Sequence, residues 1–413
     1  MSDHLPADLL RRLQDGVGAE LLAALPPYRE GEALRLAQRL RGEGHDPELV
    51  AAALTQSRLR ARARPRLGDL VDDLLLTADG AEQATRPPVA ARRAARLAGS
   101  GVEHVHDLGC GLGLDALALA EAGLAVTAVE SDPTVAAAAR ANLSAHPGVR
   151  VVEGDADEVT VPPDQGAFLD PARRTPGLAD ASGRTRRLTR LEDLSPSWSR
   201  VQQVAGQARA TVAKLSPTFP RGQVPEGTLA EWVSLDGDVV ECTLWWGGAV
   251  DSPGRAAVIG RSGPAGVVWH EVPAPAGAPA DRLDSEVDLQ PWIAEPDRAV
   301  LASGLTHALS HACGGRELDT GTGYVTAPTP VDLPWARWYA VREVLPLHPK
   351  AVRAWLRSRS VASLTVKKRG VRTDPEAFRR DLRLPRRPTG DQDVTLVLTS
   401  VAGTPRALVV EPR

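Results

Sequence analysis

The residues with the clearest chemical meaning are Asp107, Gly109, Gly111 and Gly113, which stand at alternate positions of one short run. A glycine-rich turn after a buried strand lets the backbone approach a ligand closely, and the helix that follows offers unpaired N–H groups at its start. A carboxylate two residues before the first glycine can accept a hydrogen bond from a cationic or amino group, whereas it would repel a pyrophosphate. The run therefore predicts a binding loop for a ligand that carries an amino group.

Two further acidic residues indicate which ligand this is. Glu130 ends the second expected strand and Asp155 lies at the end of the third, where they could bind ribose hydroxyls and an adenine amino group. Together with the loop, these strand ends favour S-adenosylmethionine as the cofactor. Residues 111–116 also read as G-x-G-x-x-A, and the position of Glu130 suits the ribose of a dinucleotide. A dehydrogenase and a Rossmann fold without a cofactor therefore remain alternatives.

Asp170, at the end of the fourth expected strand, is the candidate for holding or deprotonating the methyl acceptor. Enzymes that methylate base amines usually place an aromatic residue shortly after this position, where its ring stacks on the base. This chain has Ala172 and Arg173 instead, which disfavours amino methylation of a base. Arg173 and Arg174 could clamp a phosphate or carboxylate, or form a salt bridge within the protein.

The fifth expected strand ends in Lys214-Leu215-Ser216-Pro217. Methylation at carbon 5 of a pyrimidine needs a thiol that adds to the ring, and a serine hydroxyl is a much weaker nucleophile. The sequence therefore disfavours that reaction as well. Lys214 is the second candidate catalytic residue, because it could bind an anion or orient the acceptor, although a solvent-exposed lysine at a strand end is an equally good interpretation.

Short apolar strands alternate with alanine-rich helices from about residue 102 onward, which is typical of a parallel sheet covered on both faces. We expect an α/β fold with a Rossmann-like core of seven strands. The expected strands cover residues 103–107, 125–130, 149–153, 166–170, 210–215, 239–246 and 256–260, with helices over 114–122 and 133–145.

Four parts of the chain follow from this pattern. Helical spacing over 7–25 and 31–40, and a capped helix start at Asp46, predict a helical N-terminal region. The C-terminal part is expected to be α+β, with a helix over 299–312, a strand over 363–368, a helix over 374–382 and a hairpin over 393–401 and 406–410. The predicted boundaries are 1–80 for the helical region, 81–262 for the core, 263–284 for a linker and 285–413 for the C-terminal domain.

Composition limits the class of protein. The chain has 413 residues, 43% of them hydrophobic, yet no apolar stretch approaches the roughly 20 residues of a membrane helix. Three widely separated cysteines argue against disulfides and against a zinc cluster, so we expect a cytoplasmic protein without metal. Residues 341–390 contain fourteen Lys and Arg against four Asp and Glu, in a chain of net charge −3. Such a basic segment is either a nucleic-acid contact or a solvated helix face.

The chain resembles the bacterial class I methyltransferases that carry a THUMP-like domain at the C-terminus. The resemblance implies a ferredoxin-like and THUMP-like C-terminal domain, RNA as a partner, and a lid over the cofactor formed by Gln83 and Thr85. It also points to Lys367, Lys368 and Arg369 as substrate-binding residues. The motifs that carry it are residues 82–90 (EQATRPPVA), 107–113 (DLGCGLG), 170–174 (DPARR), 214–217 (KLSP), 334–337 (PWAR) and 367–371 (KKRGV).

The sequence thus predicts a methyltransferase that acts on structured RNA, either tRNA or rRNA. Two alternatives stay open. The chain could methylate a small molecule or a protein, in which case the basic domain is a scaffold. It could also be a non-catalytic RNA-binding factor that has retained the cofactor fold.

Overall fold

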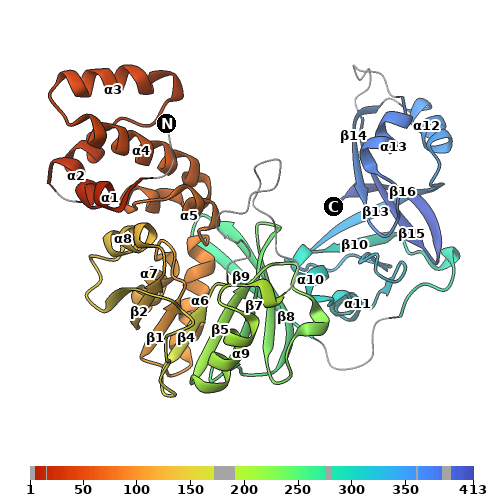
Figure 1. Ribbon diagram of the computed structural model, residues 1–413. Coiled ribbons are helices and arrows are strands. Elements are labelled where there is room, and N and C mark those ends of the chain that lie inside the picture. Colours follow the sequence, from red (N-terminus) through yellow and green to blue (C-terminus); the bar gives the residue numbers. More distant parts are fainter. Residues whose placement is uncertain (1–4, 15, 172–190, 275–280, 360, 384–391) are drawn as a thin grey trace. The chain divides into compact units, whose positions relative to one another are not determined.

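The computed structural model describes residues 5–14, 16–171, 191–274, 281–359, 361–383 and 392–413. These divide into two units (Figure 1). Unit 1 consists of Met1–Leu215, Glu226–Leu229 and Thr243–Pro253, and unit 2 of Ser216–Pro225, Ala230–Cys242 and Gly254–Arg413. Within the described ranges, no helix is both long enough and apolar enough to cross a membrane.

Unit 1 begins with the expected helices. Asp46 starts the longest of them, since its side chain accepts a hydrogen bond from the Glu48 N–H at 2.9 Å and Pro47 occupies the first turn. The helix expected over 7–25 forms as two helices. The elements are α1 (Ala7–Gln14), α2 (Gly16–Ala23), η1 (Glu30–Glu32), α3 (Ala33–Gly42), α4 (Pro47–Leu67), η2 (Gly68–Asp73) and α5 (Ala78–Gln83).

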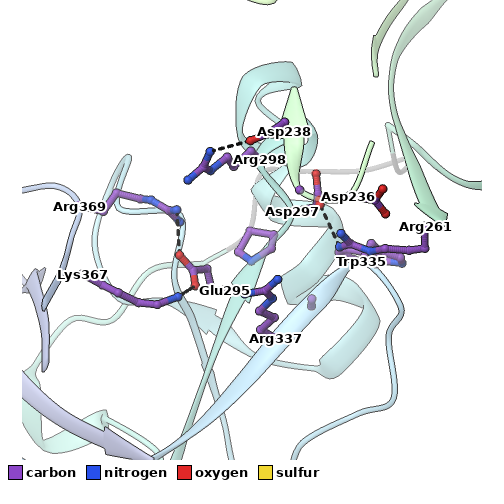
Figure 2. A pocket seen from close by; sticks show the side chains of 13 residues that line it. Asp236, Asp238, Arg261, Glu295, Asp297, Arg298, Trp335, Arg337, Lys367 and Arg369 are labelled. Carbon is purple, nitrogen blue, oxygen red and sulfur yellow. Dashed lines mark hydrogen bonds and ion pairs between the residues drawn. The ribbon is translucent and has the colours of Figure 1, made fainter. Parts of the chain in front are cut away.

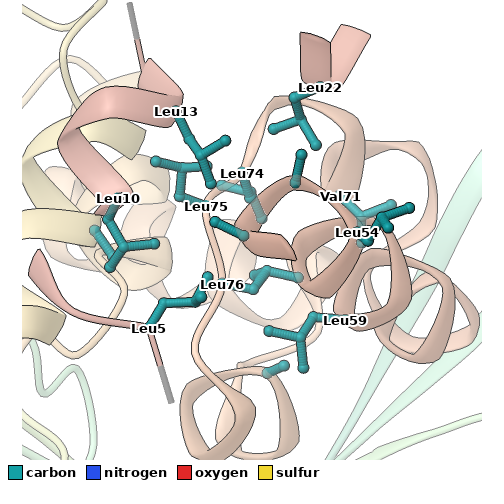
Figure 3. Close-up of a cluster of buried hydrophobic side chains, with 14 of the residues drawn as sticks. Leu5, Leu10, Leu13, Leu22, Leu54, Leu59, Val71, Leu74, Leu75 and Leu76 are labelled. Carbon is teal, nitrogen blue, oxygen red and sulfur yellow. The ribbon is translucent and has the colours of Figure 1, made fainter. Parts of the chain in front are cut away.

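A leucine-rich core joins these helices to the cofactor-binding half of unit 1. Leu10, Leu13, Leu54 and Leu76 are buried in it (Figure 3). The same core contains Leu112 of the glycine loop. The N-terminal helices therefore pack against the loop that is expected to bind the cofactor.

The middle of unit 1 is a parallel sheet in the order β3-β2-β1-β4-β5. The strand order reverses between β1 and β4, and in such sheets ligands bind in the crevice beyond the carboxyl ends of the strands at this point. The elements are α6 (Pro87–Gly99), β1 (His104–Leu108), α7 (Leu114–Glu121), β2 (Ala125–Glu130), α8 (Pro133–Asn142), β3 (Val149–Glu153), β4 (Gly166–Leu169), η3 (Leu191–Asp193), α9 (Trp198–Gln207) and β5 (Ala210–Leu215).

The sheet has more strands than the seven expected. After β5 the sheet continues in the order β7-β6-β8-β9. The carboxyl-terminal half of β7 (Asp238–Gly247) belongs to unit 1, and its amino-terminal half belongs to unit 2. The additional strands are β6 (Leu229–Leu235) and β9 (Gly266–Pro273), and β9 pairs with β8 (Gly254–Gly263). Buried Glu231 and Ser234 interrupt the apolar pattern of β6. Strand β9 occupies part of the interval expected to be a linker, because it continues the hairpin of β8.

The rest of unit 2 is a seven-stranded sheet in the order β11-β12-β10-β13-β16-β15-β14. The helix expected over 299–312 is broken at Gly304, whose φ is 73°. The expected strand, capped helix and hairpin near the C-terminus are all present. The elements are η4 (Arg221–Gln223), η5 (Glu286–Asp288), β10 (Trp292–Pro296), α10 (Arg298–Ser303), α11 (Thr306–Cys313), β11 (Arg316–Glu317), β12 (Val325–Ala327), β13 (Ala336–Pro346), α12 (Pro349–Arg357), β14 (Val361–Lys368), α13 (Pro375–Asp381), β15 (Gln392–Val401) and β16 (Thr404–Pro412).

Candidate functional site

The glycine loop joins β1 to α7 at the reversal point of the parallel sheet. Gly109 and Gly111 have φ of 90° and 56°, and a Cβ added to either would meet no atom within 4 Å. A side chain there would fill open space beside the loop. Gly113 has a φ of 81°, which favours glycine, and a Cβ there would lie 2.7 Å from Leu143 Cδ1, so the Leu143 side chain would have to move. The loop therefore leaves a bare stretch of backbone at the carboxyl edge of the sheet.

Acidic residues lie at the ends of β2 and β3 as the sequence predicts: Glu130 is the last residue of β2, and Asp155 lies two residues after β3. The Glu130 carboxylate accepts hydrogen bonds from the Gly111 N–H at 3.0 Å and the Asp132 N–H at 2.9 Å, so it holds the glycine loop. Asp155 is exposed and accepts from the Asp157 N–H at 2.9 Å. Both side chains belong to unit 1, at the carboxyl ends of β2, which neighbours β1, and of β3, which neighbours β2.

Asp107 is a buried carboxyl group at the end of β1. Its side chain has no exposed surface, and neither of its oxygens has a hydrogen-bond partner among the described residues. Burial raises the pKa of Asp107 well above its usual value, and the negative charges of Asp115 and Asp170 raise it further. An unpaired buried carboxyl group is unfavourable by itself, so this position favours a partner that arrives with a ligand.

Five polar side chains form a continuous chain of hydrogen bonds, which we call the Asp115 network: Arg93, Asp115, Thr85, Lys214 and Asp170. The guanidinium of Arg93 donates to Asp115, and the Thr85 hydroxyl donates to the other Asp115 oxygen at 2.9 Å. The Lys214 ammonium donates to the Thr85 oxygen at 3.0 Å and to the Asp170 carboxylate. The network thus connects α6 and α7 to the ends of β4 and β5.

Exposure increases along the Asp115 network. The side chains of Arg93 and Asp115 are 4% and 13% exposed, whereas those of Lys214 and Asp170 are 16% and 33% exposed. Arg93 also lies over the Phe168 ring, 4.8 Å from its centroid. The network is therefore anchored in the protein interior and ends at an accessible carboxylate.

Unit 2 contains a second group of charged side chains, the Glu295 cluster: Glu295, Lys367, Arg369, Tyr324 and Tyr339. Glu295 accepts hydrogen bonds from Lys367 at 2.5 Å, Arg369 and Tyr339 at 3.1 Å each, and Tyr324 at 3.4 Å. Figure 2 shows the ion pairs of Glu295 in one wall of a pocket of about 220 Å³. Lys367 and Arg369 are thus bound within the protein, and Lys368 between them is exposed.

Comparisons with known proteins agree on the class of the chain. Residues 105–168 match the family described as a methyltransferase domain, residues 336–412 match the THUMP domain-like family, and residues 6–63 match a domain of unknown function. Uncharacterised S-adenosylmethionine-dependent methyltransferases from Mycobacterium tuberculosis strains CDC 1551 and H37Rv are each 32% identical to it over 368 residues, which cover 86% of this chain and 93% of the relative.

The chain belongs to the S-adenosylmethionine-dependent methyltransferases. A crystal structure of a candidate methyltransferase from Porphyromonas gingivalis W83 has the same fold, with a TM-score of 0.65 and 18% identity over 93% of this chain and 99% of that chain. The predicted family, the α/β fold class and the cofactor are confirmed. The THUMP-like domain is also where the sequence predicts it, at the C-terminus.

The residues of the methyltransferase site fit S-adenosylmethionine. The open space beside Gly109 and Gly111 can accept a ligand next to bare backbone, and the unpaired Asp107 carboxyl suits a ligand with a cationic amino group. Glu130 and Asp155 lie at the same carboxyl edge of the sheet, and Gly113 is part of the glycine loop there. Among the residues with described positions, no group of three His, Cys, Asp or Glu side chains could hold a metal ion.

The structure brings together some predicted residues of the methyltransferase site and leaves others apart. Asp170, Lys214 and Thr85 join in the Asp115 network, whereas Gln83 is exposed at the end of α5. Arg173 and Arg174 lie outside the described residues. Their role in binding substrate stays a prediction, as do the roles of Lys367, Lys368 and Arg369.

Sequence reasoning missed Arg93 and Asp115. The position of Asp115 in the first turn of α7 suggests a helix cap, but the structure shows no side-chain cap there and pairs Asp115 with Arg93 and Thr85 instead. Arg93 is adjacent to Arg92 in an arginine-rich helix, so the sequence does not distinguish the buried arginine from its neighbour. The available signal is the spacing of Arg93 in α6, which places it with Ala90, Ala94 and Leu97 on the buried face.

Proposed function

We propose that this methyltransferase modifies structured RNA, either tRNA or rRNA, in the cytoplasm. The observation that supports RNA as the substrate is the basic segment 341–390, which overlaps the THUMP-like region. Its exposed cations come from several elements of unit 2, and exposed cations are the groups that contact phosphate in nucleic-acid complexes. These exposed cations include Lys350, Arg357, Lys368, Arg372 and Arg380.

In this proposal the residues of unit 1 bind the cofactor and carry out methyl transfer. The glycine loop, Asp107, Glu130 and Asp155 would hold S-adenosylmethionine, which when bound supplies an electrophilic methyl group on its sulfonium sulfur. Asp170, the accessible end of the Asp115 network, would bind the acceptor group. Catalysis would consist mainly of orientation and of proton removal from the acceptor.

The proposal is tested by measuring which class of molecule receives the methyl group. The full-length protein is incubated with methyl-tritiated S-adenosylmethionine and, separately, with total RNA, total protein and small metabolites from a strain that lacks the gene. We expect label in RNA. Label only in protein or small molecules would overturn the RNA proposal. Cofactor binding without transfer to any of the three fractions would instead support a non-catalytic RNA-binding factor.

Salt dependence provides a second measurement on the same RNA. Because phosphate contacts release counterions, retention of RNA by the full-length protein should weaken steeply as salt is raised. Retention that does not change with salt would contradict an interface built on the basic segment.

A further inference from the structure

We infer that the atom methylated is a hydroxyl oxygen, the ribose 2′-hydroxyl of RNA, with Asp170 as the proton acceptor and Lys214 stabilising the oxygen as it loses its proton. This inference rests on the proposed RNA substrate and adds the identity of the reacting group. It is carried by the geometry of the Asp115 network at the carboxyl ends of β4 and β5.

A carboxylate and an ammonium are paired at one accessible place, the carboxyl ends of β4 and β5. Lys214 donates to Asp170, and the Asp170 side chain is the most exposed of the four charged members of the network. A hydroxyl group placed against this pair meets a proton acceptor and a positive charge together. A hydroxyl is a weak acid, so it needs both in order to become a nucleophile.

The charge that develops on the acceptor differs between an amine and a hydroxyl. An amine becomes more positive as it takes up a methyl group, so the ammonium of Lys214 would oppose its methylation. An oxygen that loses a proton becomes more negative, and the same ammonium stabilises it. The sign of the charge at Lys214 therefore favours a hydroxyl over an amine.

The residues that follow β4 and β5 in the sequence also favour a ribose hydroxyl. Residues 172 and 173 are alanine and arginine, so the sequence supplies no aromatic ring there to stack on a base. Ser216 stands after β5 where a cysteine would be needed for addition to a pyrimidine ring. A ribose hydroxyl requires neither a stacking ring nor a thiol.

The proposed transfer moves one proton and one methyl group. The proton of the hydroxyl passes to the Asp170 carboxylate while the oxygen forms a bond to the methyl carbon. The bond between this carbon and the sulfonium sulfur breaks, and its electron pair stays on sulfur. The products are the methyl ether and S-adenosylhomocysteine, and the proton on Asp170 then leaves to solvent.

Thr85, Asp115 and Arg93 act in this step as positioning residues. The Thr85 hydroxyl accepts from Lys214 and donates to Asp115, so it fixes the ammonium above Asp170. Arg93 in turn holds Asp115. None of the three is placed to exchange a proton with the acceptor, because Arg93 and Thr85 are buried and Asp115 is bound by both of them.

Alkaline hydrolysis of the labelled RNA tests the inference. A 2′-O-methyl group blocks alkaline cleavage of the neighbouring phosphodiester, so label on the ribose is recovered in dinucleotides. We expect dinucleotides. Label recovered in mononucleotides would mean base methylation, which would overturn this inference while the proposed RNA substrate stands. RNA that takes up no label would overturn both.

Variants of Asp170 test its role as the proton acceptor. Asp170→Asn should lower kcat by about 100-fold or more, while S-adenosylhomocysteine, measured by calorimetry, binds within about threefold of wild type. Asp164→Asn, an exposed aspartate before β4, is the matched control and should keep wild-type kcat. An Asp170→Asn variant with wild-type kcat would rule out Asp170 as the proton acceptor.

Lys214 and Thr85 are tested by the pH profile. Lys214→Met should lower kcat, because the hydroxyl loses its stabilising charge, and should move the rising limb of kcat to higher pH, because the Asp170 carboxylate loses its cationic neighbour. Lys214→Arg should restore part of the wild-type profile. Thr85→Val should shift the profile in the same direction, with rescue by Thr85→Ser. Variants that lower kcat equally at every pH would contradict these roles.

Discussion

The Asp115 network in unit 1 and the Glu295 cluster in unit 2 are both built from carboxylates and cations, yet they end differently. Glu295 accepts four hydrogen bonds from its own cluster. The Asp115 network instead runs outward to the accessible Asp170, and unpaired Asp107 lies close enough for Asp115 and Asp170 to raise its pKa. A carboxylate satisfied by its own protein stabilises the fold, whereas accessible or unpaired carboxylates remain available to ligands.

This difference affects the interpretation of charged motifs in the sequence. Residues 367–369 read as a basic run that could contact RNA, but the structure binds Lys367 and Arg369 to Glu295. Lys214 is a single lysine in an apolar strand, and it occupies the centre of the candidate site. The burial and the hydrogen-bond partners of each side chain, rather than the number of charges in the sequence, distinguish residues 367–369 from Lys214.

Removal of the Asp115 carboxylate should have the largest effect on stability. Asp115→Asn leaves Arg93, which is 4% exposed, without its anionic partner. We expect the free energy of unfolding to fall by about 3–5 kcal/mol, as measured by guanidinium unfolding at pH 7. Wild-type stability in Asp115→Asn would show that Arg93 draws its stability from other contacts.

The pH dependence of the Asp115 effect follows from its pKa. Burial alone would raise the pKa of Asp115, but the charges of Arg93 and Lys214 outweigh it and hold the pKa below the usual value. A lowered pKa contributes stability that is present above the pKa of the unfolded state, about 4, and is lost as the pH falls through the folded value. The difference between wild type and Asp115→Asn should therefore be full at pH 7 and shrink below about pH 4.

Glu295→Gln should have the next largest effect on the free energy of unfolding, and it should affect stability only. It leaves Lys367 and Arg369 half-buried without their anion, and we expect a loss of about 2–3 kcal/mol with unchanged binding of S-adenosylhomocysteine. Asp238→Asn is the control, because its ion pair with Arg298 is 67–69% exposed and should change stability by less than about 0.5 kcal/mol. Weaker cofactor binding in Glu295→Gln would contradict a purely structural role for the cluster.

Most of the candidate site could be predicted because its residues lie at the carboxyl ends of parallel strands or shortly after them in the sequence. The glycine loop, Glu130, Asp155, Asp170 and Lys214 are found this way, since the strand ends meet at one edge of the sheet. Comparison with relatives confirms the cofactor class, while the individual roles stay predictions.

The unpredicted parts depend on contacts between distant segments. Arg93 pairs with Asp115 across two helices. The spacing of Arg93 places it on the buried face of α6, but no local pattern shows that its partner is Asp115. Strand β6 contains buried Glu231 and Ser234, which hide its apolar character. Strand β9 lies in an interval whose later proline and alanine residues suggest a linker. In each case tertiary packing, rather than local preference, decides the structure.

Asp107→Asn should have a smaller effect on stability, and one of opposite sign. Because burial raises the pKa of Asp107, the folded state favours the protonated form, and its contribution to stability is lost as the pH rises through the folded pKa. Asparagine does not titrate, so the variant should be more stable than wild type at pH 8 by on the order of 1 kcal/mol. This advantage should disappear at low pH.

Cofactor binding provides the second measurement on Asp107→Asn. If the carboxyl group receives the amino end of the ligand, calorimetry should show affinity for S-adenosylhomocysteine reduced by about tenfold, the effect of roughly 1.4 kcal/mol. Leu108→Val, at the next position of β1, is a volume control that keeps Asp107. Unchanged affinity in Asp107→Asn would mean that the loop binds its ligand without this carboxyl group.

The smallest expected effect distinguishes two adjacent lysines. Lys368 is exposed, so Lys368→Ala should keep wild-type stability and reduce the salt dependence of RNA retention by about one phosphate contact. Lys367 donates to Glu295, so Lys367→Ala should lower the melting temperature. Filter binding of tRNA at several salt concentrations measures the first effect, and thermal unfolding measures the second. A larger change in salt dependence for Lys367→Ala than for Lys368→Ala would break the comparison, because a lysine of the Glu295 cluster would then contribute more to RNA binding than the exposed one.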